Sequence, residues 1–248
     1  MTNNSEQFDA VFMRLQGLAP LKTWSLIVTL MGDLQPQAQG VLSSQMMQQI
    51  CAPFGVKPEA FRVALHRLKK DGWLVAERRG RGSVYRLSEM GVQATAAAYE
   101  QVYRGPCDAP ENWRLAMVKE PQEGGLQIGP NLMVLRDKFP ISAESLALET
   151  PFSQVPDWMK DALVSASEVA ELAAFGAALN IADFPKSPEQ RYSLRLLILH
   201  HWRRIILRHD GDVEKMLGAD WAGYAVRQRV HALFDALERL ENKVFEAV

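Results

Sequence analysis

The side chains best suited to chemistry in this chain are positively charged, and they gather between Phe54 and Ser88. This stretch has nine basic and three acidic residues. The whole chain has a formal net charge of −1 at pH 7, so the remainder carries −7. A basic island in an otherwise acidic chain indicates a polyanionic ligand. Release of counterions from phosphates would supply affinity without reading a base sequence. The basic residues are Lys57, Arg62, Arg67, Lys69, Lys70, Arg78, Arg79, Arg81 and Arg86.

A helix and a hairpin are predicted to position these charges. Pro58 suits the first turn of a helix, where a missing amide proton is tolerated, and Gly72 suits a left-handed C-terminal stop. The apolar residues between them recur with helical spacing, so one face is expected to be buried. Residues 73–78 and 83–87 are then predicted to be strands, joined by the turn sequence Arg79-Gly80-Arg81-Gly82. The apolar positions of the helix are Phe61, Ala64, Leu65 and Leu68.

Two further helices are predicted before this pair, at residues 24–34 and 43–51, with a polar loop at residues 35–40 and Ser43 as a helix cap. The order of helix, glycine-containing turn, helix and hairpin is typical of a winged helix-turn-helix. A long helix after Ser88 is expected to complete this domain, which is predicted to span residues 1–105.

This arrangement predicts which residues meet DNA. The second helix of a helix-turn-helix enters the major groove, and a hairpin lies along the backbone or in the minor groove. Arg62 lies near the start of the helix and is expected to read bases. Arg67 is expected to contact phosphate or, alternatively, to pair with an acid within the protein. The predicted DNA-binding residues are Lys57, Arg62, His66, Arg67, Lys69, Lys70, Arg79 and Arg81.

The remainder of the chain is predicted to form a small α+β domain over residues 106–184 and an all-helical domain over residues 185–248. Strands are expected between Trp113 and Arg136, followed by a helix from Asp157 to about Leu179. Apolar residues from Val226 to Val244 alternate at spacings of four and three, which predicts a helix packed lengthwise on another, within the chain or across a dimer. The predicted fold class is mainly α with small β elements (α+β).

No enzyme active site, metal site or membrane segment is expected. His200, His201 and His209 are close in sequence, but adjacent residues on a helix point about 100° apart, and no further ligand spacing completes a zinc site. Two cysteines do not make a disulfide framework. No apolar run approaches the ~18 residues of a membrane span, and the N-terminus lacks the features of a signal peptide. We therefore expect a cytoplasmic protein with no cofactor, no metal and no catalytic residue.

Several short segments carry a family resemblance at the two ends of the chain. They are Ala52–Val56, Asp71–Leu74, Arg78–Arg81, Tyr85–Leu87, Leu199–Arg204, Leu207–Arg208 and Asp220–Gly223, together with the helix that contains Arg62 and Arg67. In these segments the chain resembles the PaaX-like repressors of phenylacetate degradation.

The resemblance implies a homodimeric bacterial transcription regulator with a winged-helix domain, a ferredoxin-like middle domain and a helical C-terminal domain. Such proteins repress catabolic genes until an aryl-CoA thioester, typically phenylacetyl-CoA, releases them from operator DNA. The implied partners are thus a double-stranded DNA operator, an acyl-CoA effector and a second copy of the chain. Only a short segment separates Val118 from Gly129, where the family usually has an arginine-rich helix, so the middle domain is expected to be shortened.

The arginine-rich helix near the C-terminus is predicted to bind the effector. Its arginines could hold CoA phosphates, and its tryptophan could line an apolar pocket. Alternatively, the arginines pair with acids inside the protein and the tryptophan fills the core. The predicted effector-binding residues are Arg191, Arg195, Trp202, Arg203, Arg204 and Arg208.

Two other functions compete with a ligand-responsive repressor. A nucleic-acid-processing enzyme on a ferredoxin-like middle domain would need a catalytic acid at a strand end, and Asp137 is the candidate. The shortened middle domain argues against this enzyme. A DNA-binding protein without a ligand would differ from the repressor only in its lack of response to an effector.

Overall fold

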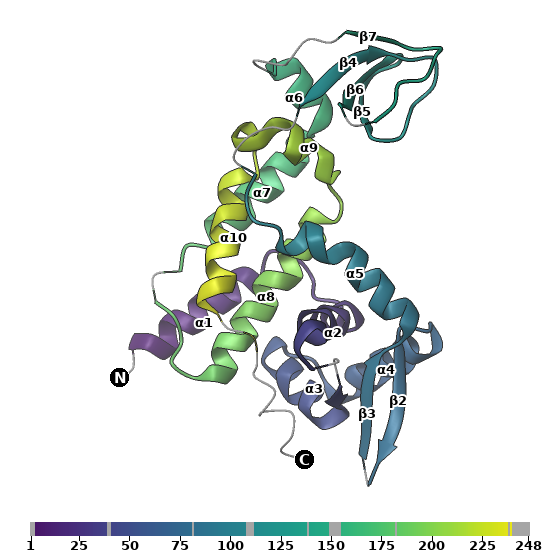
Figure 1. The fold of residues 1–248 in the computed structure, drawn as a ribbon. Helices are drawn as coiled ribbons and strands as arrows, with labels where there is room; N and C mark the ends of the chain where they lie inside the picture. Colours follow the sequence, from purple (N-terminus) through teal and green to yellow (C-terminus); the bar gives the residue numbers. More distant parts are fainter. Residues whose placement is uncertain are drawn as a thin grey trace. The chain divides into compact units, whose positions relative to one another are not determined.

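The computed structural model of the chain is mainly helical and has two small antiparallel sheets (Figure 1), in agreement with the predicted α+β class. It describes residues 3–38, 41–80, 82–107, 112–137, 139–148, 155–181, 183–237 and 239. None of the helices described there is long and apolar enough to cross a membrane.

The chain divides into two compact units. Unit 1 comprises Met1–Arg104, Ala177–Arg204 and Val230–Val248, and unit 2 comprises Gly105–Gly176 and Ile205–Arg229. The predicted division into domains 1–105, 106–184 and 185–248 stays a prediction.

The first segment of unit 1 contains five helices. Helix α2 lies among the others and packs against α3, α4 and α5. Ser43 caps α3 as predicted, because its side chain accepts a hydrogen bond from the amide of Met46 at 3.1 Å. The loop predicted at residues 35–40 is wrong in its first part, since α2 continues to Ala38. Pro36 has no amide proton for the bond to the carbonyl four residues earlier, so α2 passes through this position with one main-chain hydrogen bond fewer. The helices are α1 (Asn3–Gln16), α2 (Thr23–Ala38), α3 (Ser44–Cys51), α4 (Pro58–Lys70) and α5 (Glu89–Tyr103), with a 3₁₀ turn, η1 (Ala52–Phe54), before α4.

The end of α4 and the sheet that follows it agree with the sequence prediction. Gly72 has a φ of +78°, and the amide of Trp73 bonds to the carbonyl of Leu68 at 2.8 Å, which makes a glycine-terminated helix stop. The hairpin then pairs in antiparallel register from Leu74 opposite Leu87 to Arg79 opposite Gly82. Its strands are β2 (Leu74–Arg79) and β3 (Gly82–Leu87), and β1 (Leu42–Ser43) adds to β3 to give the order β1-β3-β2.

Helix α8 (Pro188–Ile206) is the most deeply buried helix of unit 1. All side chains from Tyr192 to Trp202 are buried, which explains why apolar residues occupy most of its circumference. Among the polar ones, Arg195, His200 and Trp202 have hydrogen-bond partners inside the unit. Its neighbour α10 (Tyr224–Ala236) supplies Val230 and Leu233 to the core.

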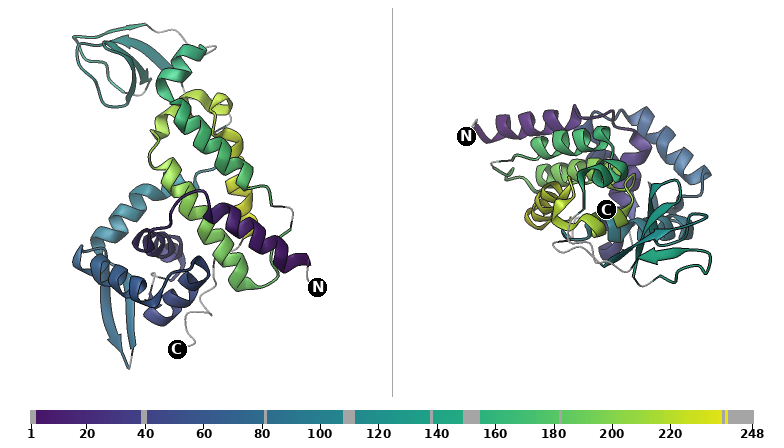
Figure 2. Two further views of the ribbon diagram at one scale, coloured as in Figure 1. Left: turned by 180° about the vertical axis from the view of Figure 1, so that it is seen from behind. Right: turned by 90° about the horizontal axis from the view of Figure 1, so that it is seen from above.

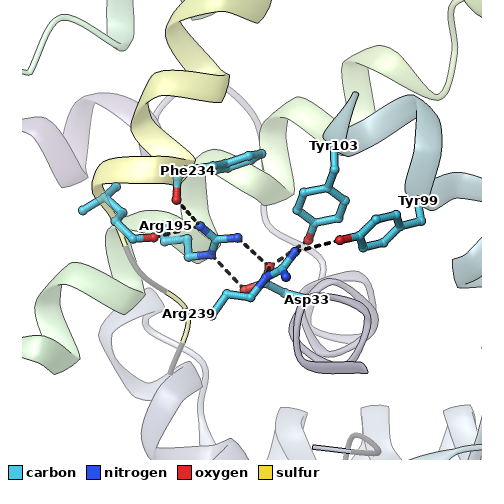
Figure 3. Close-up of polar contacts among 7 residues, drawn as sticks. Asp33, Tyr99, Tyr103, Arg195, Phe234 and Arg239 are labelled. Carbon is cyan, nitrogen blue, oxygen red and sulfur yellow. Dashed lines mark hydrogen bonds and ion pairs between the residues drawn. The ribbon is translucent and has the colours of Figure 1, made fainter. Parts of the chain in front are cut away.

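Asp33 on α2 lies at the centre of a cluster of polar contacts inside unit 1 (Figure 3). It is 1% exposed and accepts two hydrogen bonds from Arg195 of α8, at 3.0 and 2.9 Å. It also accepts a bond from the hydroxyl of Tyr103 at 2.8 Å and one from Arg239 at 3.2 Å. Arg195 donates in addition to the main-chain carbonyls of Phe234 and Leu237, each at 2.8 Å. One guanidinium thus joins α2 to α8 and to the end of α10.

Burial by itself would raise the pKa of the Asp33 carboxyl, because it penalises the charged form. The hydrogen bonds and positive charge of Arg195, with Tyr103 and Arg239, outweigh burial and hold this pKa below its ordinary value. Asp33 is therefore charged at neutral pH, and its contribution to stability is lost only as the pH falls below about 4.

Two adjacent histidines of α8 are also buried in unit 1. The hydroxyl of Thr29 lies 2.8 Å from the carbonyl of Ser25, to which it donates, and shares a second hydrogen bond with Nδ1 of His200 at 3.2 Å. Burial lowers the pKa of His200 to about 3 and that of His201 to about 4, and neighbouring positive charges act in the same direction. Both imidazoles are therefore neutral in the folded protein at neutral pH.

Unit 2 contains a four-stranded antiparallel sheet of order β5-β6-β4-β7 (Figure 1). The predicted strands between Trp113 and Arg136 are present. The prediction of a ferredoxin-like domain is wrong in connectivity, because that fold has a helix between its first two strands. Here residues 118–124 connect β4 to β5 without a helix, and they are too few to cross back over the sheet. The strands are β4 (Trp113–Met117), β5 (Gly125–Gly129), β6 (Leu132–Arg136) and β7 (Leu146–Leu148).

The helix predicted from Asp157 to about Leu179 is instead two helices, α6 (Asp157–Leu163) and α7 (Ala166–Ala178). Ser165 interrupts it with a capping box. The amide of Ser165 donates to the carboxylate of Glu168 at 2.7 Å. In return, the amide of Glu168 donates to the hydroxyl of Ser165 at 3.3 Å. Two short elements complete unit 2, namely α9 (Gly211–Leu217) and the 3₁₀ turn η2 (Gly218–Asp220).

Breaking the Asp33–Arg195 pair is expected to destabilise the protein strongly. Arg195→Met should lower the free energy of unfolding by about 3–5 kcal/mol, because it leaves a buried carboxylate with less countercharge. The double variant Asp33→Leu/Arg195→Met should lose less than the sum of the two single variants. Urea unfolding followed by circular dichroism measures this coupling. The matched control is Arg86→Met, which removes an exposed pair with Glu77 and should cost at most about 1 kcal/mol. Strict additivity of the two single changes would contradict the coupling.

Stability is expected to fall as the pH decreases from 7 to 5. The unfolded chain binds protons at His200 and His201 near pH 6.5, whereas the folded chain does so only near pH 3 to 4. Stability therefore rises with pH in this window, by about 3–4 kcal/mol for the two histidines together. The double variant His200→Gln/His201→Gln should have a flatter dependence of unfolding free energy on pH. Equal slopes for parent and variant would show that these imidazoles are not buried neutral.

Candidate nucleic-acid interface

The exposed face of α4 carries most of the predicted DNA-binding residues. Because α4 buries Phe61 and Leu65, which are 1% and 4% exposed, its other side is turned to solvent. The side chains on that side are exposed, as the helical period predicts. They are Arg62, His66, Arg67, Lys69 and Lys70, and Lys57 is exposed at the N-cap position.

The β2–β3 hairpin places a second group of positive charges in the same unit. Arg78 and Arg79 are exposed at the end of β2, next to Gly80 with a φ of +56°. The hairpin extends beyond the helices of unit 1 in the front and back views (Figures 1 and 2). Arg81, the other predicted tip residue, lies outside the described residues.

Two arginines of this region have acidic neighbours. Arg67 is 3.4 Å from Asp71 one helical turn away, and Arg86 is 3.3 Å from Glu77 across the hairpin. All four side chains are about half exposed, so these pairs are worth little in stability and are easily exchanged for another anion. Both roles foreseen for Arg67, an internal pair and a phosphate contact, are compatible with this geometry.

The predicted effector residues of unit 1 are engaged within the protein. Arg195 is 2% exposed, and all its nitrogens donate to Asp33 or to main-chain carbonyls. Arg191 donates to the carbonyl of Ala236 and lies 5.8 Å from the ring of Phe184. A ligand at these arginines would have to replace those bonds.

Trp202 and Arg203 also contact the helices of the N-terminal part. The indole of Trp202 is fully buried and donates to the carbonyl of Val102 on α5 at 2.9 Å. Arg203 donates to the hydroxyl of Ser25 on α2 at 2.8 Å, and burial lowers the pKa of its guanidinium. Arg204 is half-buried in the same unit, whereas Arg208 lies in unit 2 and pairs with Glu171.

No cluster of three or more His, Cys, Asp or Glu side chains able to hold a metal ion occurs within the described ranges. The third candidate histidine, His209, lies in unit 2 beside Glu168, with 3.5 Å between Nδ1 and the carboxylate. Asp137, the acid considered for an enzyme, follows β6 and is 3.2 Å from Arg114.

Two residues outside the predicted sites matter in the structure. Asp33 is a lone acid in the apolar α2 sequence, which is the signal for a buried pair, but its partner Arg195 is distant in the chain. Val63 is 68% exposed on the same side of α4 as the basic residues. Helical spacing alone places it there, two positions beyond Phe61.

Comparison with known proteins gives the family of the chain. The model of the PaaX-like protein family matches residues 22–91, which contain α2 to β3, and the model of the PaaX-like protein C-terminal domain matches residues 169–247. The chain is also similar to Transcriptional repressor PaaX of Escherichia coli (strain K12). The two are 24% identical over 90% of this chain and 82% of that protein.

A solved structure supports the fold. It is Uncharacterized protein Rv0674 from Mycobacterium tuberculosis, which is 18% identical, with a TM-score of 0.51 over 85% of this chain and 93% of that one. Since the two family models together cover both ends of the chain and the relative covers nearly all of it, the chain belongs to the PaaX-like family.

Proposed function

We propose that this chain is a DNA-binding transcriptional regulator of the winged helix-turn-helix type, acting as a repressor. In this proposal α3 and α4 are the two helices of the motif, α4 enters the major groove, and the β2–β3 hairpin is the wing. The observation that carries it is the exposed basic side of α4 in the same unit as the basic hairpin. The name of the Escherichia coli relative, a transcriptional repressor, supports the same function.

The finer parts of the proposal rest on the family. We propose that the protein acts as a cytoplasmic homodimer, represses an aromatic catabolic operon of the phenylacetate type, and leaves its operator when an aryl-CoA thioester binds. The DNA contacts are assigned to Lys57, Arg62, His66, Arg67, Lys69, Lys70, Arg79 and Arg81.

Some of the residues predicted to bind the effector are already hydrogen-bonded inside the protein, so they are not placed to contact a ligand directly. Arg195 and Trp202 serve the interior of unit 1, so a ligand would act on them through α8 rather than by displacing their hydrogen bonds. Among the predicted residues, Arg208 is 56% exposed, which leaves its guanidinium accessible to a phosphate once its pair with Glu171 opens. We keep all six residues as candidates, with Arg208 the one best placed for direct contact with CoA.

The test is fluorescence anisotropy on DNA from upstream of the gene and its neighbours, with random duplex as the competitor. We expect specific binding that phenylacetyl-CoA reverses and free CoA does not. Specific binding that ignores the thioester would keep the regulator and remove the effector, in favour of a DNA-binding protein without a ligand. Equal binding to specific and random duplex would contradict the repressor.

The wing makes a separate prediction. Arg79→Ala should weaken binding to all duplexes alike and lower the slope of log affinity against log salt by about one unit, because one phosphate contact is lost. The control is Lys119→Ala, which removes an exposed positive charge from unit 2 and should leave the slope unchanged. An unchanged slope for Arg79→Ala would remove the hairpin from the interface.

A further inference from the structure

Val63 is the most exposed of the large apolar side chains in the described residues, at 68%. Single exposed apolar residues are common on protein surfaces and need no explanation by themselves. Val63 differs because of its neighbours. It lies between Arg62 and Ala64 in sequence and one helical turn from Arg67 and His66, on the side of α4 that carries the positive charge.

The position of Val63 on the helix can be derived from the buried stripe. Each residue of an α-helix is rotated by about 100° from the last. Val63 therefore projects about 150° from the centre of the stripe formed by Phe61, Ala64, Leu65 and Leu68. Arg62 and Arg67 project only about 110° from that centre, one on each flank. Val63 is thus on the outermost line of α4, and the two arginines lie beside it.

Three other residues share this outermost line, and together with Val63 they follow one another at spacings of four, three and four positions. They are Glu59, His66 and Lys70, with Val63 between the first two. A line that contacted only phosphates would be cationic throughout, and Glu59 would be repelled. The edges of bases, in contrast, present donors, acceptors and a methyl group, so that an acid, an apolar side chain, an imidazole and an ammonium each have a partner there.

Valine at this position contributes little to the packing of the chain. It buries little surface, and its β-branched side chain favours a helix less than alanine does. The basic residues around Val63 point to a nucleic acid as its partner. Phosphates and sugars offer no apolar group against which a valine side chain could pack on the floor of the groove. The exposed apolar group of the major groove is the 5-methyl of thymine.

We propose that Val63 packs against the 5-methyl group of one thymine in the major groove and so determines part of the operator sequence. This inference rests on the proposed function, since it requires α4 to enter the groove. It adds a specificity-determining residue to Arg62, the arginine expected to read bases, and it leaves Arg67 on the other flank to contact a phosphate at the wall of the groove.

The test begins with duplexes enriched from a random pool by the parent protein. In one of them each thymine is replaced singly by deoxyuridine, which lacks only the 5-methyl group. Parent protein should bind one such duplex about fourfold more weakly, the factor expected for one buried methyl group. Val63→Ala should bind the unmodified duplex more weakly by a similar factor and should lose nothing further at that deoxyuridine.

Two variants control for indirect effects. Val169→Ala truncates an exposed valine on α7 in unit 2 and should keep the full deoxyuridine effect. Arg79→Ala should weaken binding to every duplex but also keep that effect. Circular dichroism checks that Val63→Ala is folded, as expected for alanine at an exposed helical site.

The outcomes separate this inference from the proposed function. If no duplex is enriched over random sequence, the regulator itself fails and the inference fails with it. If duplexes are enriched but no deoxyuridine weakens binding, or if Val63→Ala responds to each deoxyuridine as the parent does, only the role of Val63 is overturned.

Discussion

A buried carboxylate needs a countercharge, and in this protein that requirement joins segments that are far apart in the chain. Asp33 is nearly inaccessible to water, and Arg195 meets it with two hydrogen bonds. The same guanidinium donates to two carbonyls at the end of α10, groups that a helix terminus otherwise leaves without partners. Removing either charge would leave the other buried, so α2, α8 and the end of α10 are held together by one electrostatic constraint.

This constraint determines how unit 1 can move. Three more contacts join α8 to the N-terminal helices, from His200 to Thr29, from Trp202 to Val102 and from Arg203 to Ser25. Separating α8 from α2 would therefore break several buried hydrogen bonds at once, and each group that stayed buried without a partner would cost about 1–3 kcal/mol. Since α4 packs directly on α2, a displacement of α8 that keeps these bonds carries α2 and α4 with it.

Much of unit 1 could be predicted from the sequence because its signals are local. Pro58, the apolar period and Gly72 define α4 within one residue, and Ser43 caps α3 as expected. The capping box at Ser165 is an equally local signal, but the continuous helical period conceals it and predicts one helix where there are two. The family resemblance alone implies a ferredoxin-like middle domain. Its failure follows from chain length, because the residues between β4 and β5 leave no room for a crossover helix.

Some residues of the candidate site can be identified from their charge in the sequence, whereas others are recognised only from their burial or exposure in the structure. Positive charge is visible in the sequence wherever it lies, so the basic residues of α4 and the hairpin could be found without coordinates. Arg195 has the same charge, but the sequence does not reveal that its ion-pair partner is Asp33, 162 positions away in the chain. Val63 is the opposite case, since an apolar residue in an amphipathic helix is assumed to face the core. Its exposure becomes informative only once Phe61, Ala64, Leu65 and Leu68 are known to fill the buried stripe, because Val63 then lies outside that stripe among the basic residues proposed to contact DNA.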